Sequence, residues 1–325
     1  MVSTPAPDVP GASGRVEPAA SVQFGQYPPA RRTILHLSDT HLLAGNVPLG
    51  GRYDTAANLR RTLDAVEGLG IRPDAIVFTG DLTDLGEPEA YRALRAAIEP
   101  VAERLAAPVI WVAGNHDERP ALRRDLLRLE PSEEPVTAVH DLGGLRLIVL
   151  DTTVPGWHHG DLDDAQLEWL QGELATAAPL GTILAMHHPP LPSHVPLFDI
   201  LELRDQSRLA RVVAGTDVRA ILAGHLHYST NGTFAGIPVS VSAATCYTMD
   251  LARPAAEVNG MDAGQSFHLV HVYDDTITHS VVPLAGSADG DYFSPEWYER
   301  MSRLTADERL EVFSRKPDRS VAPNA

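Results

Sequence analysis

Short apolar runs recur between residues 34 and 223, separated by longer stretches of mixed polarity. Runs of this length, bounded by turn residues, are typical of buried strands, and the stretches between them are long enough for helices. Strands that alternate with helices predict a layered α/β domain. The candidate strands are Ile34–Leu37, Ala75–Phe78, Val109–Val112, Leu145–Leu150, Thr182–Met186 and Ala220–Ala223.

The stretches between these runs have the apolar periodicity of amphipathic helices. In Glu87–Leu105 the apolar side chains recur at steps of three and four, and Pro88 suits a first helical turn. Asp163 is a candidate N-cap, and Gly215 is a candidate stop signal for another helix. The sequence predicts helices at Thr55–Gly68, Glu87–Leu105, Asp163–Thr176 and Asp205–Ala214.

The pattern changes after His227 to Ser-, Thr- and Val-rich alternation with turn residues, as far as about Leu284. Such alternation predicts antiparallel strands that form or finish a second sheet. Residues 1–30 are rich in Pro, Ala, Gly and Ser, lack an apolar signal-peptide core, and are expected to form a flexible extension. The expected organisation is an extension at 1–30, one domain at 31–285 and a tail at 286–325.

The tail combines two helix-start signals with an apolar stripe. Ser294 precedes Pro295, and Thr305 with Glu308 matches a capping box, so two short amphipathic helices are expected. Trp297, Met301 and Leu304 would form the stripe. It could pack on its own domain, form a homodimer interface or touch a membrane, although the mixed charge of the polar face disfavours a membrane.

Composition excludes several functional classes. Lys and Arg total 26 against 43 Asp and Glu, a formal charge of −17, which disfavours a nucleic-acid polymer as partner. Lys316 is the only lysine, so P-loop, Schiff-base and kinase-type lysines are absent. The single cysteine, Cys246, excludes an intrachain disulfide and a thiolate cluster. Any metal must therefore have N and O ligands.

No stretch of the sequence has the pattern of a membrane span, and a cytoplasmic location is expected.

Metal-ligating residue types follow the predicted strands within a few residues. In an open α/β sheet the loops beyond the carboxyl ends of the strands lie together, so these residues are expected at one edge. Two pairs are spaced i and i+2, which places both side chains on one face of an extended chain. The residues are Asp39, His41, Asp81, Asn115, His116, His187, His225 and His227.

This donor set of imidazoles, carboxylates and an amide suits Fe, Mn or Zn, and is too rich in nitrogen for Mg or Ca. The seven candidate ligands, which are this set without His116, exceed the needs of one tetrahedral ion. Two ions about 3.5–4 Å apart, bridged by a carboxylate, account for the number and form a hydrolytic site. Such a pair would create a positive pocket in a negative protein, which favours a phosphate substrate.

The motifs Asp39-Thr40-His41, Gly80-Asp81, Gly114-Asn115-His116-Asp117, His187 and Gly224-His225-Leu226-His227 resemble, in order, those of the calcineurin-like metallophosphoesterase family. The segments 72–81 and 215–225 are similar to those of its class III cyclic-nucleotide phosphodiesterases. The resemblance runs from about Thr33 to Leu284. It implies a four-layer α/β/β/α sandwich of two mixed sheets flanked by helices.

The resemblance also implies ligand roles. The first metal would bind Asp39, His41 and His227, the second would bind Asn115, His187 and His225, and Asp81 would bridge them. The metals would be Fe and Mn, with Zn or Co as alternatives. Substrate phosphate would lie against His41, Asp81, Asn115, His116 and His227.

The implied activity is hydrolysis of small phosphodiesters, including 3′,5′-cyclic nucleotides (cAMP to AMP), by a hydroxide that bridges the metals. The alternatives are a phosphomonoesterase or glycerophosphodiesterase of the same superfamily, or a scaffold protein that acts through its tail. A diester leaves as an alkoxide, and His116 is placed to donate a proton to it. Its alternative role is that of a buried orienting histidine.

Other polar residues near the motifs have less specific interpretations. Asp84 and Asp117 could hydrogen-bond the ligand imidazoles or cap turns. His158 and His159 could reach a substrate base, with Trp157 available for stacking, or simply be exposed loop residues. The remaining histidines considered are expected to be structural: His36, His188, His268 and His271.

Overall fold

The computed structural model describes residues 22–254, 256–284 and 294–316, and these fall into two compact units. The larger unit comprises residues 30–284, and the smaller comprises 22–29 together with 294–316. Most of the expected extension at 1–30 and the end of the tail lie outside the described residues. The two units are described separately.

The larger unit contains two mixed sheets flanked by helices. The first sheet has five strands in the order β13-β12-β1-β2-β3. The strands β1, β2 and β3 are parallel, with Leu35 opposite Ile76. The strand β12 runs antiparallel to β1, and β13 runs antiparallel to β12. Their bounds are Arg32–Leu37 for β1, Ala75–Thr79 for β2, Val109–Val112 for β3, Ser266–Val272 for β12 and Ile277–Pro283 for β13.

The second sheet has six strands in the order β4-β5-β6-β7-β9-β8. Its four central strands are parallel, and an antiparallel strand lies at each edge. A separate hairpin pairs β10 (Thr248–Met249) with β11 (Gly260–Met261). The bounds in the second sheet are Ala138–Asp141, Arg146–Val149, Thr182–Ala185, Val218–Ala223, Thr230–Phe234 and Ile237–Val241 for β4 to β9.

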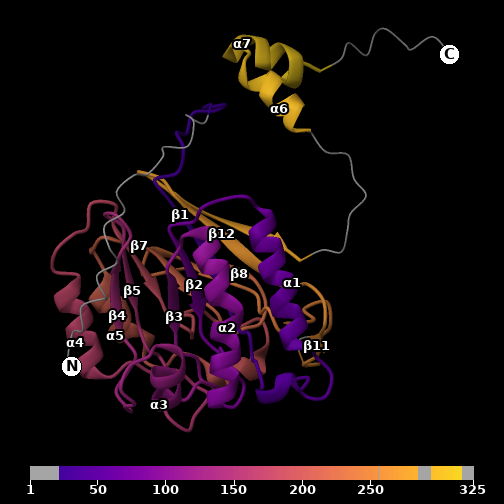
Figure 1. Ribbon diagram of the computed structural model, residues 1–325. Helices are drawn as coiled ribbons and strands as arrows, with labels where there is room; N and C mark the ends of the chain where they lie inside the picture. The colour runs from indigo at the N-terminus through magenta and orange to yellow at the C-terminus, as the bar shows by residue number, and fades with distance from the viewer. Residues whose placement is uncertain (1–21, 255, 285–293, 317–325) are drawn as a thin grey trace. The chain divides into compact units, whose positions relative to one another are not determined.

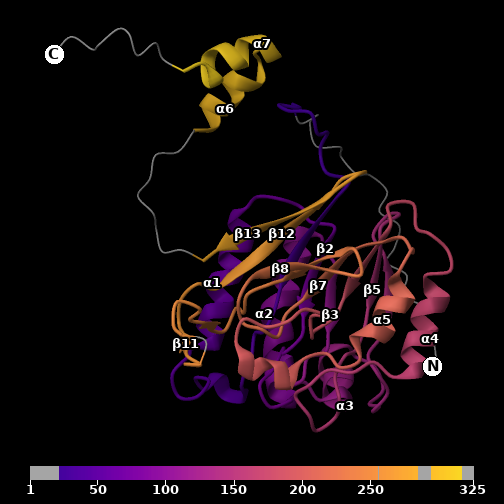
Figure 2. The same cartoon turned by 180° about the vertical axis from the view of Figure 1, so that it is seen from behind.

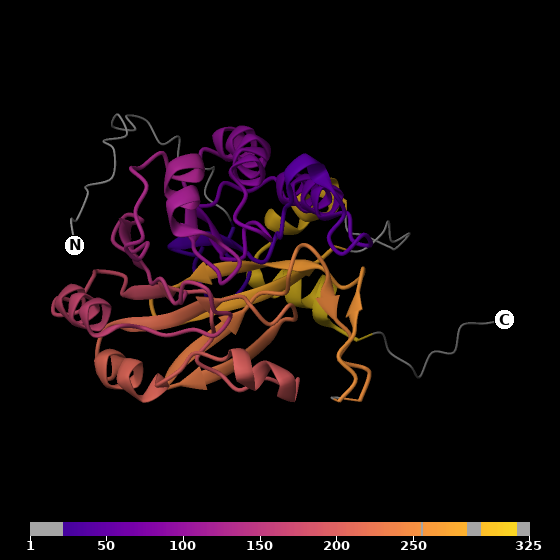
Figure 3. The same cartoon turned by 90° about the horizontal axis from the view of Figure 1, so that it is seen from below.

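Three apolar cores separate four layers, which confirms the expected α/β/β/α sandwich. One core joins the first sheet to α1 (Thr55–Gly68) and α2 (Pro88–Leu105), and another joins the second sheet to α4 (Asp164–Glu173) and α5 (Gln206–Val213). The third core lies between the sheets. Figures 1 and 2 show α1 and α2 against one sheet and α4 and α5 beside the other, and Figure 3 shows helices on both sides of the strands.

Local sequence signals account for the helix starts. Asp54 accepts a hydrogen bond from Ala57 N at 2.8 Å and caps α1, and Asp163 accepts one from Gln166 N at 2.7 Å and caps α4. The predicted helices and strands all occur, with ends that differ by up to three residues. A short helix, α3 (Arg119–Ala121), precedes a π-turn at Leu122–Leu126.

The expectation for the region after His227 was wrong in one respect. Its strands do not form or finish a single sheet, because β8 and β9 complete the second sheet whereas β12 and β13 complete the first. In addition, β9 pairs with β7 in parallel. Alternation identifies a strand but not its partner, which long-range packing decides.

The smaller unit contains the two short helices expected in the tail, α6 (Pro295–Ser302) and α7 (Ala306–Arg309), followed by a π-turn. The Thr305–Glu308 capping box is present. The ring centroids of Trp297 and Phe313 lie 5.2 Å apart, and Arg309 lies over the ring of Phe24 at 4.8 Å. Across the described part of the chain, no helix has the length and apolarity needed to span a membrane.

Candidate dinuclear metal site

Five loops at the carboxyl ends of five strands bring the candidate ligands together. The loops after β1, β2 and β3 in the first sheet carry Asp39, His41, Asp81 and Asn115. The loops after β6 and β7 in the second sheet carry the rest. The prediction of a single sheet edge was therefore too simple, because both sheets contribute to one site. The second sheet contributes His187, His225 and His227.

Five of the candidate ligands have left-handed backbone conformations. Their φ values are 53° for Asp39, 43° for His41, 48° for Asp81, 71° for His225 and 57° for His227. The extended chain assumed for the two i, i+2 pairs was therefore wrong, although both members of each pair still reach the site. Non-glycine residues in this region of φ are uncommon, and such strain clusters at functional sites.

Two motif glycines allow the loops to approach each other closely. A Cβ at Gly224 would overlap Ser38 Oγ and lie 2.7 Å from Asp39 Oδ2. A Cβ at Gly114 would likewise overlap the backbone nitrogen of Asp81. Side chains at these two positions would push the ligand loops apart.

The first half of the site is a cluster of four buried side chains. Asp39, His41, Asp81 and His227 each place one ligand atom within 4.8 Å of the others. His41 Nε2 lies 3.1 Å from His227 Nε2 and 3.4 Å from Asp81 Oδ2, and His227 Nε2 lies 3.5 Å from Asp39 Oδ1. Two imidazole nitrogens that face each other among carboxylates form a suitable donor set for a cation.

The second half shares the carboxylate of Asp81. His187 Nε2 lies 3.3 Å from Asp81 Oδ2 and 3.1 Å from Asn115 Oδ1. His225 Nε2 lies 3.1 Å from the carbonyl oxygen of Leu201, so it can donate there and leave Nδ1 for a cation. The sequence held no signal for Leu201, because its contribution comes from the backbone.

Hydrogen bonds fix the orientation of two other imidazoles. His41 Nδ1 lies 2.9 Å from Asp84 Oδ1, and His187 Nδ1 lies 2.7 Å from the carbonyl oxygen of Thr79. In both rings the acceptor holds the proton on Nδ1 and leaves Nε2 free to ligate. Of the two interpretations of Asp84, the structure therefore favours the partner of an imidazole.

The charges of the cluster fit a cation. Burial raises the pKa of Asp39 to about 6, against the opposing effect of His187. Burial alone would lower the pKa values of His41 and His187, but hydrogen bonds and charge from Asp81 raise them to about 10 and about 9. The carboxylates thus favour positive charge at the site, and the donor set fits two transition-metal ions.

His116 lies beside this cluster. Its backbone nitrogen donates to Asp81 Oδ1 at 2.9 Å, and its Nδ1 donates to the carbonyl oxygen of Asp84 at 2.9 Å. Its ring centroid is 4.8 Å from that of His41 and 4.8 Å from that of His158. The side chain is partly exposed, at 29% of its surface.

The loop after β5 brings one of its histidines into the site. Asn115 Nδ2 donates to His158 Nδ1 at 2.9 Å, which turns Oδ1 of the amide toward His187. His158 lines the pocket, whereas the neighbouring His159 and Trp157 do not. The proposed stacking role of Trp157 is therefore not supported by its position.

Of the two interpretations of Asp117, the structure favours the cap of a turn. Asp117 is 8% exposed and accepts hydrogen bonds from the backbone nitrogens of Gly114, Leu82 and Thr83, and from the hydroxyl of Tyr91 at 2.9 Å. It thus joins the loops after β2 and β3 rather than orienting an imidazole.

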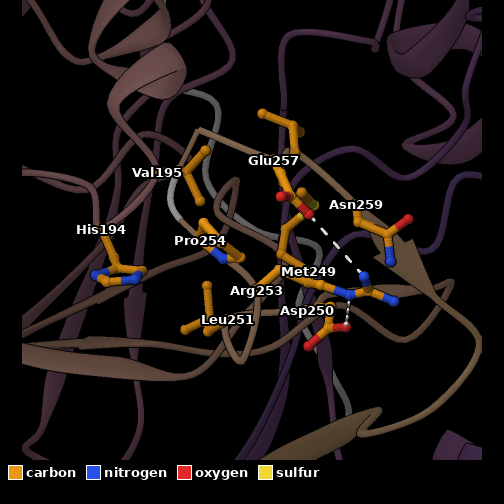
Figure 4. A pocket seen from close by; sticks show the side chains of 10 residues that line it. His194, Val195, Met249, Asp250, Leu251, Arg253, Pro254, Glu257 and Asn259 are labelled. Carbon is orange, nitrogen blue, oxygen red and sulfur yellow. Dashed lines mark hydrogen bonds and ion pairs between the residues drawn. The ribbon is translucent and has the colours of Figure 1, made fainter.

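The ligand cluster forms the floor of a pocket of about 420 Å³. Polar side chains line one side, and an apolar wall and rim contain Leu49, Tyr53, Tyr247, Phe198 and Leu201. A second hollow, of about 10 Å³, has space for about one water molecule. Figure 4 shows Arg253 in this hollow, paired with Asp250 and Glu257 at 3.4 and 4.0 Å. Only the larger pocket has room for an organic substrate.

The family model for calcineurin-like phosphoesterases matches residues 32–229. The chain therefore belongs to this family and is a metallophosphoesterase, a hydrolase with a binuclear metal centre.

Among individual proteins, the chain is 55% identical over 275 residues to the cAMP/cGMP dual specificity phosphodiesterase of Mycobacterium tuberculosis (strain CDC 1551 / Oshkosh), covering 84% of this chain and 86% of that protein. It is 32% identical to the glycerophosphodiester phosphodiesterase GpdQ of Enterobacter lignolyticus, covering 64% of this chain and 77% of that protein. The fold resembles a solved dimetal phosphatase from Danio rerio, with a TM-score of 0.57 at 15% identity, covering 79% of this chain and 97% of that one.

Proposed function

We propose that this metallophosphoesterase hydrolyses 3′,5′-cyclic nucleotides to nucleoside 5′-monophosphates, with cAMP converted to AMP. The geometric observation that supports a diester substrate is the position of His116. Its imidazole is partly exposed and is held beside the ligand cluster by Asp81 and Asp84. The choice of a cyclic nucleotide is supported by the 55% identity to the mycobacterial cAMP/cGMP phosphodiesterase.

We assign the ligands by the same proposal. Asp39, His41 and His227 would hold one metal ion, Asn115, His187 and His225 the other, and the carboxylate of Asp81 would be shared. When bound, two such ions lower the pKa of water and offset the charge of the phosphate. Iron and manganese are the proposed metals, because the set combines carboxylate oxygens with several imidazole nitrogens.

The residues of the chain would then handle the leaving group. Hydrolysis to a 5′-monophosphate breaks the bond between phosphorus and O3′, and the departing oxygen needs a proton. Because His116 Nδ1 donates to the Asp84 carbonyl, Nε2 is the nitrogen left to donate that proton. The Asp84 carboxylate also lies 3.5 Å from Nδ1.

Substrate phosphate would lie against His41, Asp81, Asn115, His116 and His227, all of which line the pocket. We add His158 to this set, because it lines the same pocket and its ring is hydrogen-bonded to Asn115. An exposed imidazole beside a phosphate site can donate to a phosphate oxygen without needing to bind a metal.

The alternative function is hydrolysis of glycerophosphodiesters, which is supported by the 32% identity to GpdQ. The test is to compare kcat/KM of the metal-loaded enzyme for cAMP, glycerophosphocholine, bis(4-nitrophenyl) phosphate and 4-nitrophenyl phosphate. We expect cAMP to exceed glycerophosphocholine, and the aryl diester to exceed the aryl monoester. Negligible turnover of cAMP beside rapid turnover of glycerophosphocholine would contradict the proposal, and a preference for the monoester would contradict a diesterase altogether.

A homodimer is the assembly that we propose. Leu310, Val312 and Phe313 of the smaller unit are each about 60% exposed, and exposed apolar side chains favour protein contacts. Sedimentation of the full chain should give twice the mass of one chain, and a single-chain mass would contradict this assembly.

A further inference from the structure

One wall of the pocket is a continuous series of aromatic rings that begins at the ligand cluster. The ring of Tyr247 lies 4.5 Å from that of His227. The ring of Tyr53 is stacked on Tyr247 with a centroid distance of 4.6 Å and an interplanar angle of 14°. Both tyrosines are partly exposed and line the pocket. The series therefore extends from the ligand cluster along the lining of the pocket.

Three separate elements hold this wall in place. Tyr53 and Leu49 exchange backbone hydrogen bonds of 3.1 and 2.9 Å, and the next residue, Asp54, caps α1. Tyr247 directly precedes β10. Opposite β10, a Cβ at Gly260 would lie 2.8 Å from Tyr53 Oη and 3.0 Å from two atoms of the Tyr247 ring. The backbone at Gly260 therefore supports both rings from behind.

We propose that the Tyr53–Tyr247 pair is the surface that receives the base of a nucleotide and favours phosphodiesters whose sugar carries a planar heterocycle. The proposal rests on the proposed function, since it assumes a nucleotide in the pocket. Ligands near His227 fix the phosphate at one end of the wall, so the base of the same molecule extends along the rings. An aromatic wall offers a π-surface to any base. Adenine and guanine should consequently bind with similar strength.

The competing role for the pair is structural, because Tyr247 also packs against His227 and could simply hold that ring. The two roles predict different kinetics. Loss of a base-binding surface weakens only substrates that carry a base and raises KM, whereas a displaced His227 lowers kcat for every substrate. Tyr53 separates the roles best, because its ring is stacked on Tyr247, whereas Tyr247 lies against the ligand His227. The guanidinium of Arg52 lies over the Tyr53 ring at 5.7 Å from its centroid.

The experiment compares Tyr53→Ala and Tyr53→Phe with a control, Tyr298→Ala, which removes an exposed tyrosine of the smaller unit that does not line this pocket. The substrates are cAMP, cGMP and a base-free 3′,5′-cyclic ribose phosphate. We expect Tyr53→Ala to lower kcat/KM on the order of tenfold for both nucleotides, through KM, and to leave the base-free substrate within about twofold. Tyr53→Phe and the control should resemble the wild type. Equal losses on all three substrates, or no loss on any, would overturn the proposal.

A second measurement separates failure of this inference from failure of the proposed function. Turnover of bis(4-nitrophenyl) phosphate serves as the reporter, with AMP and ribose 5-phosphate as competing inhibitors. In the wild type AMP should inhibit more strongly than ribose 5-phosphate, and Tyr53→Ala should remove the difference. If cAMP proves not to be a substrate but this preference holds, the base surface stands without the proposed reaction. If the two inhibitors are equal in the wild type, the base surface is refuted whatever the substrate.

Discussion

The two sheets contribute different chemistry to the site. Every candidate oxygen ligand comes from loops of the first sheet, on Asp39, Asp81 and Asn115, whereas the second sheet contributes imidazoles alone. The first sheet therefore provides the negative charge and the second provides neutral donors. Neither sheet carries a complete ligand set for either metal. The packing between the sheets must consequently set the geometry of the site. Substitutions that change the contribution of one sheet at a time test this division.

The largest effect should follow from removal of the shared carboxylate. Asp81→Ala leaves both halves of the site without a common ligand, and we expect loss of bound metal and a fall in activity of roughly a thousandfold or more. Metal content by elemental analysis and kcat/KM for cAMP measure the two effects. The control is Asp64→Ala, which removes an exposed carboxylate of α1. Retention of both metals and of full activity in Asp81→Ala would refute the shared ligand.

Replacement of His116 should separate proton donation from metal binding. His116→Ala should retain both metals and lose about 10² to 10⁴ in kcat for cAMP, because an alkoxide leaves poorly without a proton. For bis(4-nitrophenyl) phosphate, whose leaving group needs no proton, the loss should be far smaller. Equal losses on both substrates would show that the imidazole only positions the substrate.

The hydrogen bond that orients His41 should be easier to remove than the one that orients His225. His41 is held by the side chain of Asp84, whereas His225 is held by a backbone carbonyl. Asp84→Asn keeps the shape of the side chain but removes the charge that holds His41, and we expect metal affinity to fall by about 10- to 100-fold. Titration with metal should reveal one weakened and one unchanged ion. If both ions weaken equally, the two halves of the site are not separately supported.

The last expected effect concerns stability and the layer between the sheets rather than activity and the site. Burial lowers the pKa of His268 from 6.5 to about 4, and Ser229 and Ser240 hold the ring at 3.1 Å on each side. A histidine that is neutral when folded stabilises the protein above pH 6.5, and this stability is lost as the pH falls toward 4. The loss through this residue is on the order of 3 kcal/mol.

Urea unfolding of the wild type and of His268→Gln at several pH values measures this effect. The variant should lose less stability between pH 6.5 and 4 than the wild type does. Identical slopes in the two proteins would contradict a titrating His268. Because His36 and His279 also have lowered pKa values through burial, some pH dependence should remain in the variant.

The features predictable from the sequence were those with local causes. The helix Thr55–Gly68 and the strand Val109–Val112 have the predicted bounds, because the capping of Asp54 and the apolar run are encoded within a few residues. The motifs pointed to one cluster of candidate ligands for a similar reason, since each follows a strand end directly.

The features that escaped prediction depend on distant parts of the chain. The sequence could not show that β12 joins β1, or that the carbonyl of Leu201 holds His225, because each pairing is made only on folding. Backbone conformation was also hidden. Asp39 and His41 adopt left-handed φ values that an alternating pattern does not encode. The wall formed by Tyr53 and Tyr247 joins residues almost two hundred positions apart.

The close approach of Gly224 to the loop after β1 limits which parts of the site can change in sequence. The gap there between the loops of the two sheets is smaller than a methyl group, so the floor of the pocket tolerates almost no displacement of one sheet against the other. The tyrosine wall and the rim at Phe198 belong to loops and a hairpin that lie outside both sheets. New substrates can therefore be accommodated by exchanging wall and rim residues while the hydrolytic floor stays the same.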